Sequence, residues 1–261
     1  MAPTTNAVTN ALDLLDLLGR SGEGLRLKDI AAQLELPESS THRLLASLLS
    51  RGFVEQQEDH GVYRLGWKIV VLANALGRDA RLVQLMRPYL ERLAQELKQT
   101  INLAVLSNDQ VMYLDCQTPR HSLALYVAPG LTLPAHATSL GKAMLAFHPP
   151  SEQAALLDRL RLEPITASTL TSKDSLLTAL ADIRRRGFAY DRGELRQDVS
   201  CVAAPILDHR GHVLAAISVT APTTSLPADW EASFPAAVTA VAREASGKLF
   251  GATSDTASLT D

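Results

Sequence analysis

Cysteine is nearly absent from this chain of 261 residues, which contains only Cys116 and Cys201. Two cysteines are too few for a disulfide framework, so a reducing cytoplasm is the simplest expectation. No apolar run reaches the roughly 18–20 uninterrupted residues that cross a bilayer, and the first residues lack a basic region followed by an apolar block. The sequence therefore predicts a cytoplasmic protein with neither a secretory signal nor a membrane partner.

An excess of basic residues is also missing. The chain has 25 Lys and Arg against 28 Asp and Glu, a formal net charge of −3. Residues 1–80 have 8 basic and 10 acidic residues, and 8 less 10 gives −2. Because a nucleic-acid-binding module usually carries a basic excess, such a module is expected to bind weakly alone and to need two copies on one site.

Short catalytic motifs are absent as well. The sequence contains no G-x-S-x-G elbow, no H-E-x-x-H helix and no phosphate-binding loop. His209 and His212 share a turn, but two imidazoles without an identified third ligand make a poor metal site. We therefore expect no enzyme activity, no cofactor and no metal. A hydrolase or acyl-transfer enzyme with Cys201 or Ser139 as its nucleophile is the alternative.

Residues 27–66 carry the most informative pattern in the chain. A short helix from Leu27 to Leu34 places its apolar residues on one face. After a tight break, Pro37 suits the first turn of a second helix, because its missing N–H group has no partner to lose there. This second helix is predicted from about Glu38 to Ser50.

The second helix has two faces of different chemistry. At roughly 100° per residue, Leu44, Leu45 and Leu48 point inward, and Thr41 turns inward with them. The outer face is small and polar, carries the guanidinium of Arg43 and has no acid, as a helix entering a major groove requires. The residues predicted to bind DNA are Lys28, Ser39, Ser40, Thr41, His42, Arg43, Ser47, Tyr63 and Arg64.

A β-hairpin is predicted after the second helix. Phe53–Glu55 and Val62–Leu65 are typical of strands, with Asp59-His60-Gly61 as the turn between them. A further helix from Val8 to Leu18 can pack beneath the others. Residues 1–66 are therefore predicted to form a winged helix-turn-helix domain that binds double-stranded DNA, with Arg64 on the wing reaching the backbone.

The rest of the chain predicts a helical linker and an α+β sheet domain. Helices at 67–76 and 82–97 form a linker and dimerisation surface over residues 67–98, and the second either kinks or restarts at Pro88. Mixed strands and helices over residues 99–250 imply a sheet domain, and residues 251–261 are expected to be disordered. The predicted strands are 102–107, 110–117, 122–127, 188–191, 201–207 and 213–220, and the predicted helices are 140–147, 151–160, 172–186 and 229–250.

Three places in the sheet domain could carry chemistry. The first is Thr138 and Ser139 before an apolar helix with Gly141 in its first turn, either an ordinary N-cap or a helix N-terminus that holds a carboxylate. The second is Cys201 near Asp191, which is either inert core or a nucleophile.

The third place is the strand 213–220. Alternation puts Ser218 and Thr220 on one face of this strand. Two neighbouring hydroxyls face either a ligand or solvent.

Taken together, these patterns resemble the IclR family of bacterial transcription regulators from about Val8 to Phe250. In the first domain the resemblance rests on Leu27–Ala32, Leu36–Leu45 and Gly61–Gly66. In the second it rests on His136–Ala146, Arg185–Ala189, Cys201–Ile206 and Ala216–Pro222. Each fragment alone is weak, but their order and spacing together are specific.

The resemblance implies a GAF-like effector-binding domain, joined by a helical linker to the winged module and assembled as a homodimer or homotetramer. It also implies that the three places form one small-molecule pocket, in which Cys201 is a wall residue. Carried over by motif, the effector-binding residues are Ser139, Leu140, Gly141, Asp191, Cys201, Ser218 and Thr220.

The expected function is regulated binding to an operator, as a repressor or an activator. A small organic or aromatic acid in the second domain is expected to change the relative placement of two modules through the linker helices. The modules would read palindromic half-sites about one helical turn, roughly 34–36 Å, apart. A ligand-free domain acting as a protein-interaction or oligomerisation platform is the remaining alternative.

Two positions depart from the family pattern. Asn10 stands where an arginine is common early in the first helix, which puts an expected phosphate or minor-groove contact in doubt. Asp198 stands three residues before the cysteine, where glycine is common. An acid near the pocket would disfavour an anionic effector or select one with a hydroxyl or amine.

Overall fold

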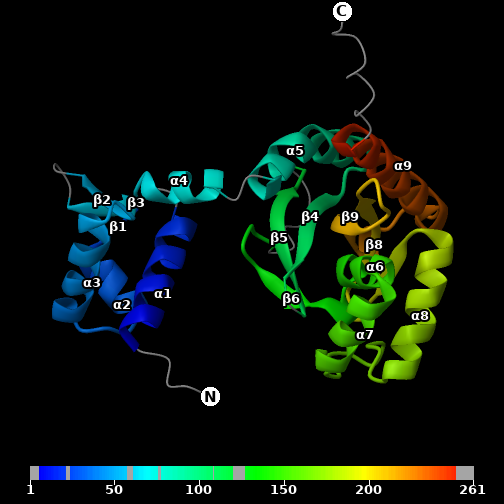
Figure 1. Cartoon of the computed structure of the whole chain (residues 1–261), viewed down its shortest axis with the longest axis horizontal. Helices are drawn as coiled ribbons and strands as arrows, with labels where there is room; N and C mark the ends of the chain where they lie inside the picture. Colours follow the sequence, from blue (N-terminus) through cyan, green and yellow to red (C-terminus); the bar gives the residue numbers. More distant parts are fainter. Residues whose placement is uncertain are drawn as a thin grey trace, which may run out of the picture. The chain divides into compact units, whose positions relative to one another are not determined.

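The structure is a computed structural model that describes residues 6–21, 24–57, 61–75, 78–107, 109–119 and 127–250. The chain divides into two compact units, residues 1–81 and residues 82–261. Each unit has its own hydrophobic core and is described by itself (Figure 1). Among the described residues, no helix is both long enough and apolar enough to cross a membrane.

The N-terminal unit packs helices against a three-stranded antiparallel sheet of order β1-β3-β2. Buried Leu14, Ile30 and Leu45 bring three of the helices together on Val54 and Tyr63 of the sheet. The elements are α1 (Asn6–Ser21), β1 (Leu25–Arg26), α2 (Leu27–Gln33), α3 (Glu38–Ser50), β2 (Val54–Gln57), β3 (Val62–Leu65) and α4 (Lys68–Ala75).

The helix-turn-helix is confirmed, and α3 has the predicted bounds. Its first turn is closed by the carbonyl of Pro37, which accepts hydrogen bonds from the N–H groups of Ser40 and Thr41 at 2.9 and 3.0 Å. The chain reverses before it at Glu35, which adopts the left-handed conformation with φ 53°. Tertiary packing therefore holds a turn geometry that glycine would adopt more readily.

The strands of the wing are present, with Val54 opposite Leu65. The predicted turn at 59–61 lies outside the described residues except for Gly61, whose φ is 59°. Two details differ from the sequence-based expectation. Strand β1 was not predicted, and α1 runs from Asn6 to Ser21, longer than the helix predicted from Val8 to Leu18.

Helix α5 (Arg78–Leu97) passes through Pro88 without restarting. Its buried side chains Leu82, Met86, Leu90 and Leu93 belong to the core of the C-terminal unit. The second half of the segment predicted as a linker is thus packed against the sheet.

A six-stranded antiparallel sheet of order β6-β5-β4-β9-β8-β7 forms the centre of the C-terminal unit. The strands are β4 (Thr100–Ser107), β5 (Gln110–Gln117), β6 (Thr132–Pro134), β7 (Ala189–Arg192), β8 (Val199–Leu207) and β9 (Val213–Pro222). Five of these strands were predicted, and short β6 was not. The strand predicted at 122–127 lies outside the described residues except for Val127.

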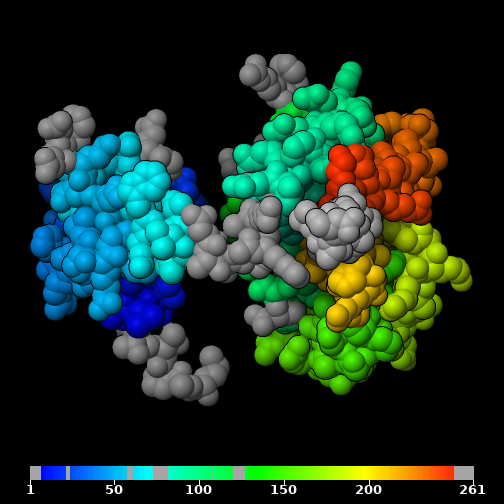
Figure 2. Space-filling model, turned by 45° about the horizontal axis from the view of Figure 1, so that its top comes forward, coloured from blue at the N-terminus to red at the C-terminus, as the bar shows by residue number. Residues whose placement is uncertain are grey.

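Helices cover both faces of this sheet. On one face, α5 and α9 (Trp230–Phe250) lie side by side (Figures 1 and 2) and are joined by an ion pair between Arg92 and Glu244. On the other face lie α6 (Ser139–Phe147), α7 (Pro150–Arg159) and α8 (Lys173–Arg186). The Ser172 hydroxyl caps α8, and Gly187 at φ 87° ends it. The tail predicted to be disordered lies outside the described residues.

Candidate functional site

Strand register brings the predicted polar residues together on the face covered by α6. Asp191 lies opposite Cys201, Cys201 opposite Thr220, and Thr220 opposite Thr100, which makes one row across four strands. Ser218 lies two residues before Thr220 and therefore points to the same face. Leu103, Val202 and Ile217 point to the opposite face, into the core under α5 and α9.

The N-terminus of α6 packs over this face of the sheet. Thr138 is its N-cap, and its side-chain oxygen accepts a hydrogen bond from the Gly141 N–H group at 3.1 Å. The N–H groups of Ser139 and Leu140 are in the first turn, where a helix supplies no backbone partner. With the helix dipole they favour a negatively charged or hydrogen-bond-accepting ligand group.

A cavity of about 310 Å³ lies between the polar row and the start of α6. Six of the seven predicted effector-binding residues line it: Ser139, Leu140, Asp191, Cys201, Ser218 and Thr220. The other described lining residues are Tyr113, Val127, Leu131, Leu133, Thr138, Leu195, Arg196 and Val199. The cavity therefore has one polar end and apolar walls, as small-molecule sites commonly do.

Gly141 is the one predicted effector-binding residue that is not among the described residues lining the cavity. A Cβ atom at this position would lie 2.1 Å from the backbone oxygen of Ala135. Only glycine lets the preceding turn pack this closely on α6, and that packing holds Ser139 and Leu140 at the cavity.

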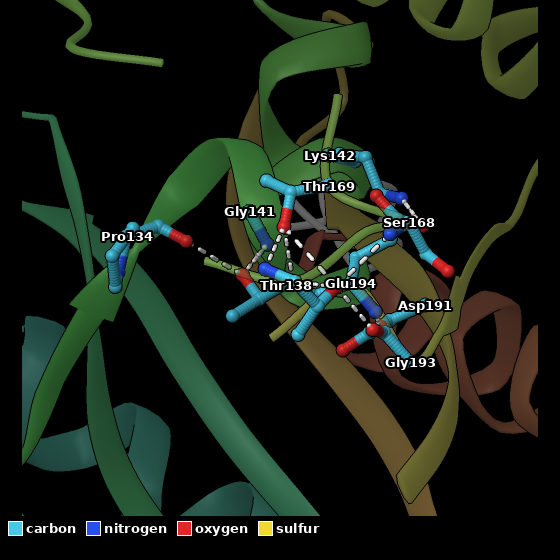
Figure 3. Close-up of polar contacts among 10 residues, drawn as sticks. Pro134, Thr138, Gly141, Lys142, Ser168, Thr169, Asp191, Gly193 and Glu194 are labelled. Carbon is cyan, nitrogen blue, oxygen red and sulfur yellow. Dashed lines mark hydrogen bonds and ion pairs between the residues drawn. The ribbon is translucent and has the colours of Figure 1, made fainter. Parts of the chain in front are cut away.

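Buried charges stand behind the polar end of the cavity. Lys142 and Glu194 form an ion pair with side chains only 4% and 11% exposed. Asp191 accepts a hydrogen bond from the Glu194 N–H group at 2.7 Å. Figure 3 shows these three side chains gathered where α6 meets the turn that follows β7.

The turn after β7 is also tied to a distant loop. The Thr169 hydroxyl donates to the Glu194 carbonyl at 2.6 Å, and the Thr166 hydroxyl donates to the Gly193 carbonyl at 2.7 Å. In Figure 3 the bond from Thr169 reaches Glu194 from the side opposite Asp191. Such a network holds Asp191 in a fixed position against the cavity.

Burial raises the pKa of Asp191 to about 7, while the hydrogen bond from the Glu194 N–H group and the charge of Lys142 oppose the rise. A neutral carboxyl at this wall can donate a hydrogen bond to an anionic ligand. Burial also raises the pKa of the Cys201 thiol well above its ordinary value, and the charge of Asp191 raises it further. Because the thiolate is the nucleophilic form, these surroundings suit a wall residue and not a nucleophile.

Two residues at or beside the cavity were not predicted from the sequence. Asn102 on β4 donates hydrogen bonds to the hydroxyls of Ser218 and Thr220 at 3.2 and 3.1 Å. Tyr113 on β5 forms part of the cavity wall, and burial raises its pKa. A polar asparagine within an apolar strand was the available signal for Asn102, but its partner strand lies more than 100 residues away.

Asp198 was expected to place an acid beside the effector pocket. Its side chain is 65% exposed, and it is not among the described residues that line the cavity. It pairs with Arg196, which does line the cavity.

Five of the six predicted DNA-contact residues on α3 lie at its surface. Ser39, His42, Arg43 and Ser47 are exposed, and Ser40 is half-buried. The Ser47 hydroxyl donates to the Arg43 carbonyl at 3.0 Å. Lys28 on α2 and Arg64 on β3 are also at the surface, and Asn10 on α1 is half-buried.

Thr41 and Tyr63 were predicted as DNA contacts, but both are buried. The Thr41 side chain is fully buried and its hydroxyl donates to the Pro37 carbonyl at 3.2 Å. Tyr63 is 6% exposed and packs in the core of the N-terminal unit. Both residues support the module from inside, so neither is available as a DNA contact.

The chain matches two family models. Residues 7–58 match the IclR helix-turn-helix domain, and residues 75–247 match the model described as bacterial transcriptional regulator IclR C-terminal.

Among the described residues, no cluster of three His, Cys, Asp or Glu side chains is arranged to hold a metal.

Relatives and solved structures agree with these models. The chain is 35% identical over 240 residues to the HTH-type transcriptional regulator BhcR of Paracoccus denitrificans, covering 92% of this chain and 86% of that protein. It is 33% identical over 248 residues to the transcriptional repressor IclR of Escherichia coli, covering 93% and 90%.

Two structures are similar over almost the whole chain. The Thermotoga maritima IclR structure has a TM-score of 0.76 at 24% identity and covers 94% of this chain and 98% of that one. An IclR homolog from Microbacterium hydrocarbonoxydans complexed with 4-hydroxybenzoate has a TM-score of 0.71 at 25% identity and covers 92% and 95%. The chain therefore belongs to the IclR family of DNA-binding transcriptional regulators, which have ligand-binding C-terminal domains.

Proposed function

We propose that this protein is a homodimeric or homotetrameric regulator that binds a palindromic operator through α3 and releases or tightens it when an organic acid fills the C-terminal cavity. It acts in the cytoplasm, where its DNA target lies. The single observation that carries the proposal is the cavity itself, because polar residues from neighbouring strands and the start of α6 converge on it.

The DNA-binding half rests on the exposed face of α3. Arg43 is the guanidinium on that face, and Ser39, Ser40, His42 and Ser47 surround it with small polar side chains. Arginine is suited to a major groove because it donates two hydrogen bonds to guanine or pairs with a phosphate. We assign Arg43 the main contact, with Lys28 and Arg64 reaching the backbone.

The test begins with duplexes selected by the full chain from a random pool. Arg43→Ala should weaken binding to the selected duplex by about tenfold or more at fixed salt, since a good base contact contributes about 1–3 kcal/mol. Arg185→Ala is the matched control, because Arg185 is an exposed arginine of the C-terminal unit. Equal affinity for wild type and Arg43→Ala would contradict the assignment of α3.

The effector half rests on the polarity of the cavity. One end offers the hydroxyls of Ser218 and Thr220, the first N–H groups of α6 and the Asp191 carboxyl, and the walls are apolar. A small acid with an apolar body, such as an aromatic acid, matches this division. The 4-hydroxybenzoate bound by the Microbacterium homolog is a ligand of that class.

Thermal unfolding against a panel of small acids tests the cavity, because a ligand of the folded state raises stability by an amount set by its concentration and Kd. Ser218→Ala and Asp191→Ala should blunt the response and leave binding to the selected duplex intact. Ser233→Ala on α9 removes an exposed hydroxyl away from the cavity and is the control. Normal responses in both cavity variants would show that the effector binds elsewhere.

The proposal includes no catalysis. The relatives compared are transcriptional regulators, and the raised pKa of Cys201 opposes a nucleophilic thiolate. An acyl-ester turnover screen checks this directly, since activity that disappears in Cys201→Ser would establish the hydrolase alternative.

A further inference from the structure

Arg196 combines two properties that set it apart from the other residues of the cavity. Arg196 is one of the residues that line the cavity, and its side chain is 56% exposed to solvent. It is also the only arginine or lysine among the described lining residues, while Asp191 is the only acid. A lining residue with an exposed side chain lies at the rim of the cavity, so the one cation among these described residues is at the solvent end.

Asp198 holds the Arg196 guanidinium in a bidentate ion pair. Nε of Arg196 lies 3.1 Å from Oδ1 of Asp198, and Nη2 lies 2.7 Å from Oδ2. This pairing lowers the pKa of Asp198, chiefly through the hydrogen bonds from Arg196. The fork of a guanidinium matches any carboxylate in this geometry, so Asp198 occupies the place that a ligand carboxylate can take.

The backbone that carries this pair is anchored at both ends. On one side, the Asp191–Glu194 turn is fixed by the hydrogen bonds drawn in Figure 3. On the other, the Asp198 carbonyl accepts hydrogen bonds from the N–H group and the hydroxyl of Thr223 at 2.8 and 3.2 Å. The Val199 N–H group closes the turn onto the Arg196 carbonyl at 3.1 Å. The main chain is thus held while the long Arg196 side chain can move.

We propose that Arg196 is a specificity-determining residue that selects effectors with a second carboxylate at their outer end, and that Asp198 is the counterion that this carboxylate displaces. The inference rests on the proposed effector cavity and deepens it to a substrate class, the dicarboxylic acids with an apolar body. One carboxyl sits at the polar end beside Ser139 and Asp191. The other replaces Asp198 on Arg196.

The exchange is favoured by the exposure of the ion pair. Both side chains are more than half exposed, and exposed ion pairs are weak because solvent and salt screen them. A ligand carboxylate held over an apolar wall is partly shielded from water, and its hydrogen bonds to the guanidinium are stronger there. Leu195 and Val199, which flank the Arg196 turn in the sequence, supply part of that wall.

Matched acid pairs measure the selection whatever the natural effector is. Terephthalate is compared with 4-methylbenzoate, adipate with hexanoate, and succinate with butyrate, by calorimetry on the full chain. Wild type should prefer at least one diacid over its monoacid by about tenfold or more, because a hydrogen bond to a charged group is strong. Arg196→Gln should remove that preference by lowering the affinity for the diacid to that of its matched monoacid.

Two further variants sharpen the result. Asp198→Asn should raise diacid affinity several-fold and not change monoacid affinity, because the guanidinium is released. Arg185→Gln removes an exposed arginine on α8 and is expected to match wild type.

The outcomes separate this inference from the function it rests on. If no diacid binds wild type, or if Arg196→Gln keeps the diacid preference, the role of Arg196 is refuted. If acids bind wild type and their affinity falls in Ser218→Ala, the effector cavity stands in either case. Acid binding that Ser218→Ala and Asp191→Ala leave unchanged refutes the cavity as well.

Discussion

Asp191 makes the stability of the C-terminal unit depend on pH. Its pKa is raised to about 7, mainly by burial, so between about pH 4 and pH 7 the folded chain keeps a proton that the unfolded chain releases. Because the folded state binds more protons in this window, the free energy of unfolding falls as pH rises through it. Well above pH 7 the folded chain has released the proton as well, and the free energy of unfolding stops falling.

Asp191→Asn should therefore stabilise the C-terminal unit at pH 8 and have a smaller effect at pH 5. Trp230 packs on Tyr190 and Phe234 in this unit, so its fluorescence in denaturant reports unfolding once exposed Trp67 is replaced by Phe. Asp198→Asn is the contrasting variant, since the pKa of Asp198 is lowered and its titration falls below the window. Parallel stability curves for wild type and Asp191→Asn would contradict the raised pKa.

At the residue scale, the lining of the cavity was predictable where short motifs resemble those of the IclR family. Asp191, Cys201, Ser218 and Thr220 sit in short motifs whose order identifies them. Asn102 was not predicted because its role depends on register between β4 and β9, which pairs residues more than 100 positions apart. Arg196 was not predicted because only three-dimensional placement shows that it lines the cavity, whereas its partner Asp198 does not.

At the element scale, helices with local stop and start signals were predicted within a few residues. Pro37 before α3 and Gly187 after α8 are examples, because caps and left-handed turns are local chemistry. Short β1 and β6 were missed, since strands of two or three residues form only where a partner strand already exists. Thr41 is buried, as the helical periodicity predicted, and Tyr63 is buried too, so burial argues against both only as DNA contacts.

Helix α6 can pack closely against the preceding turn because residue 141 is glycine. Its Cβ would meet the Ala135 oxygen at 2.1 Å and the Ala135 Cα at 2.4 Å. Both obstacles are backbone atoms, which cannot rotate away as a side chain does. Gly141→Ala should therefore destabilise the C-terminal unit by about 3 kcal/mol or more, at the upper end of overpacking costs.

Gly247 provides the matched control on α9. A Cβ there would meet nothing within 4 Å, so Gly247→Ala should be neutral or stabilise by about 0.5–1 kcal/mol through helix propensity. The free energy of unfolding is read from Trp230 in the Trp67→Phe background. A Gly141→Ala variant as stable as wild type would contradict the tight packing of α6 against Ala135.

At the scale of the whole molecule, regulated DNA binding requires more than either unit. The first 80 residues have a net charge of −2, from 8 basic and 10 acidic residues, so one winged module gains little from long-range attraction to DNA. Two modules on one duplex raise the affinity because the second binds at a high effective concentration. The charge count of the sequence could suggest that two modules are needed. How two copies of the chain would pair could not be predicted, because it depends on contacts between copies.

The spacing of half-sites in the selected duplex tests this requirement. Inserting about 5 base pairs between the half-sites turns one of them by about half a helical turn, because a full turn takes about 10–10.5 base pairs. Only one module can then dock in register, and affinity should fall by about 100-fold or more, within the range that multivalency contributes. Changing the same number of spacer bases without altering the length controls for composition. An insertion that leaves the affinity unchanged would show that one module binds alone, and the coupling of effector to operator would then have to act within a single chain.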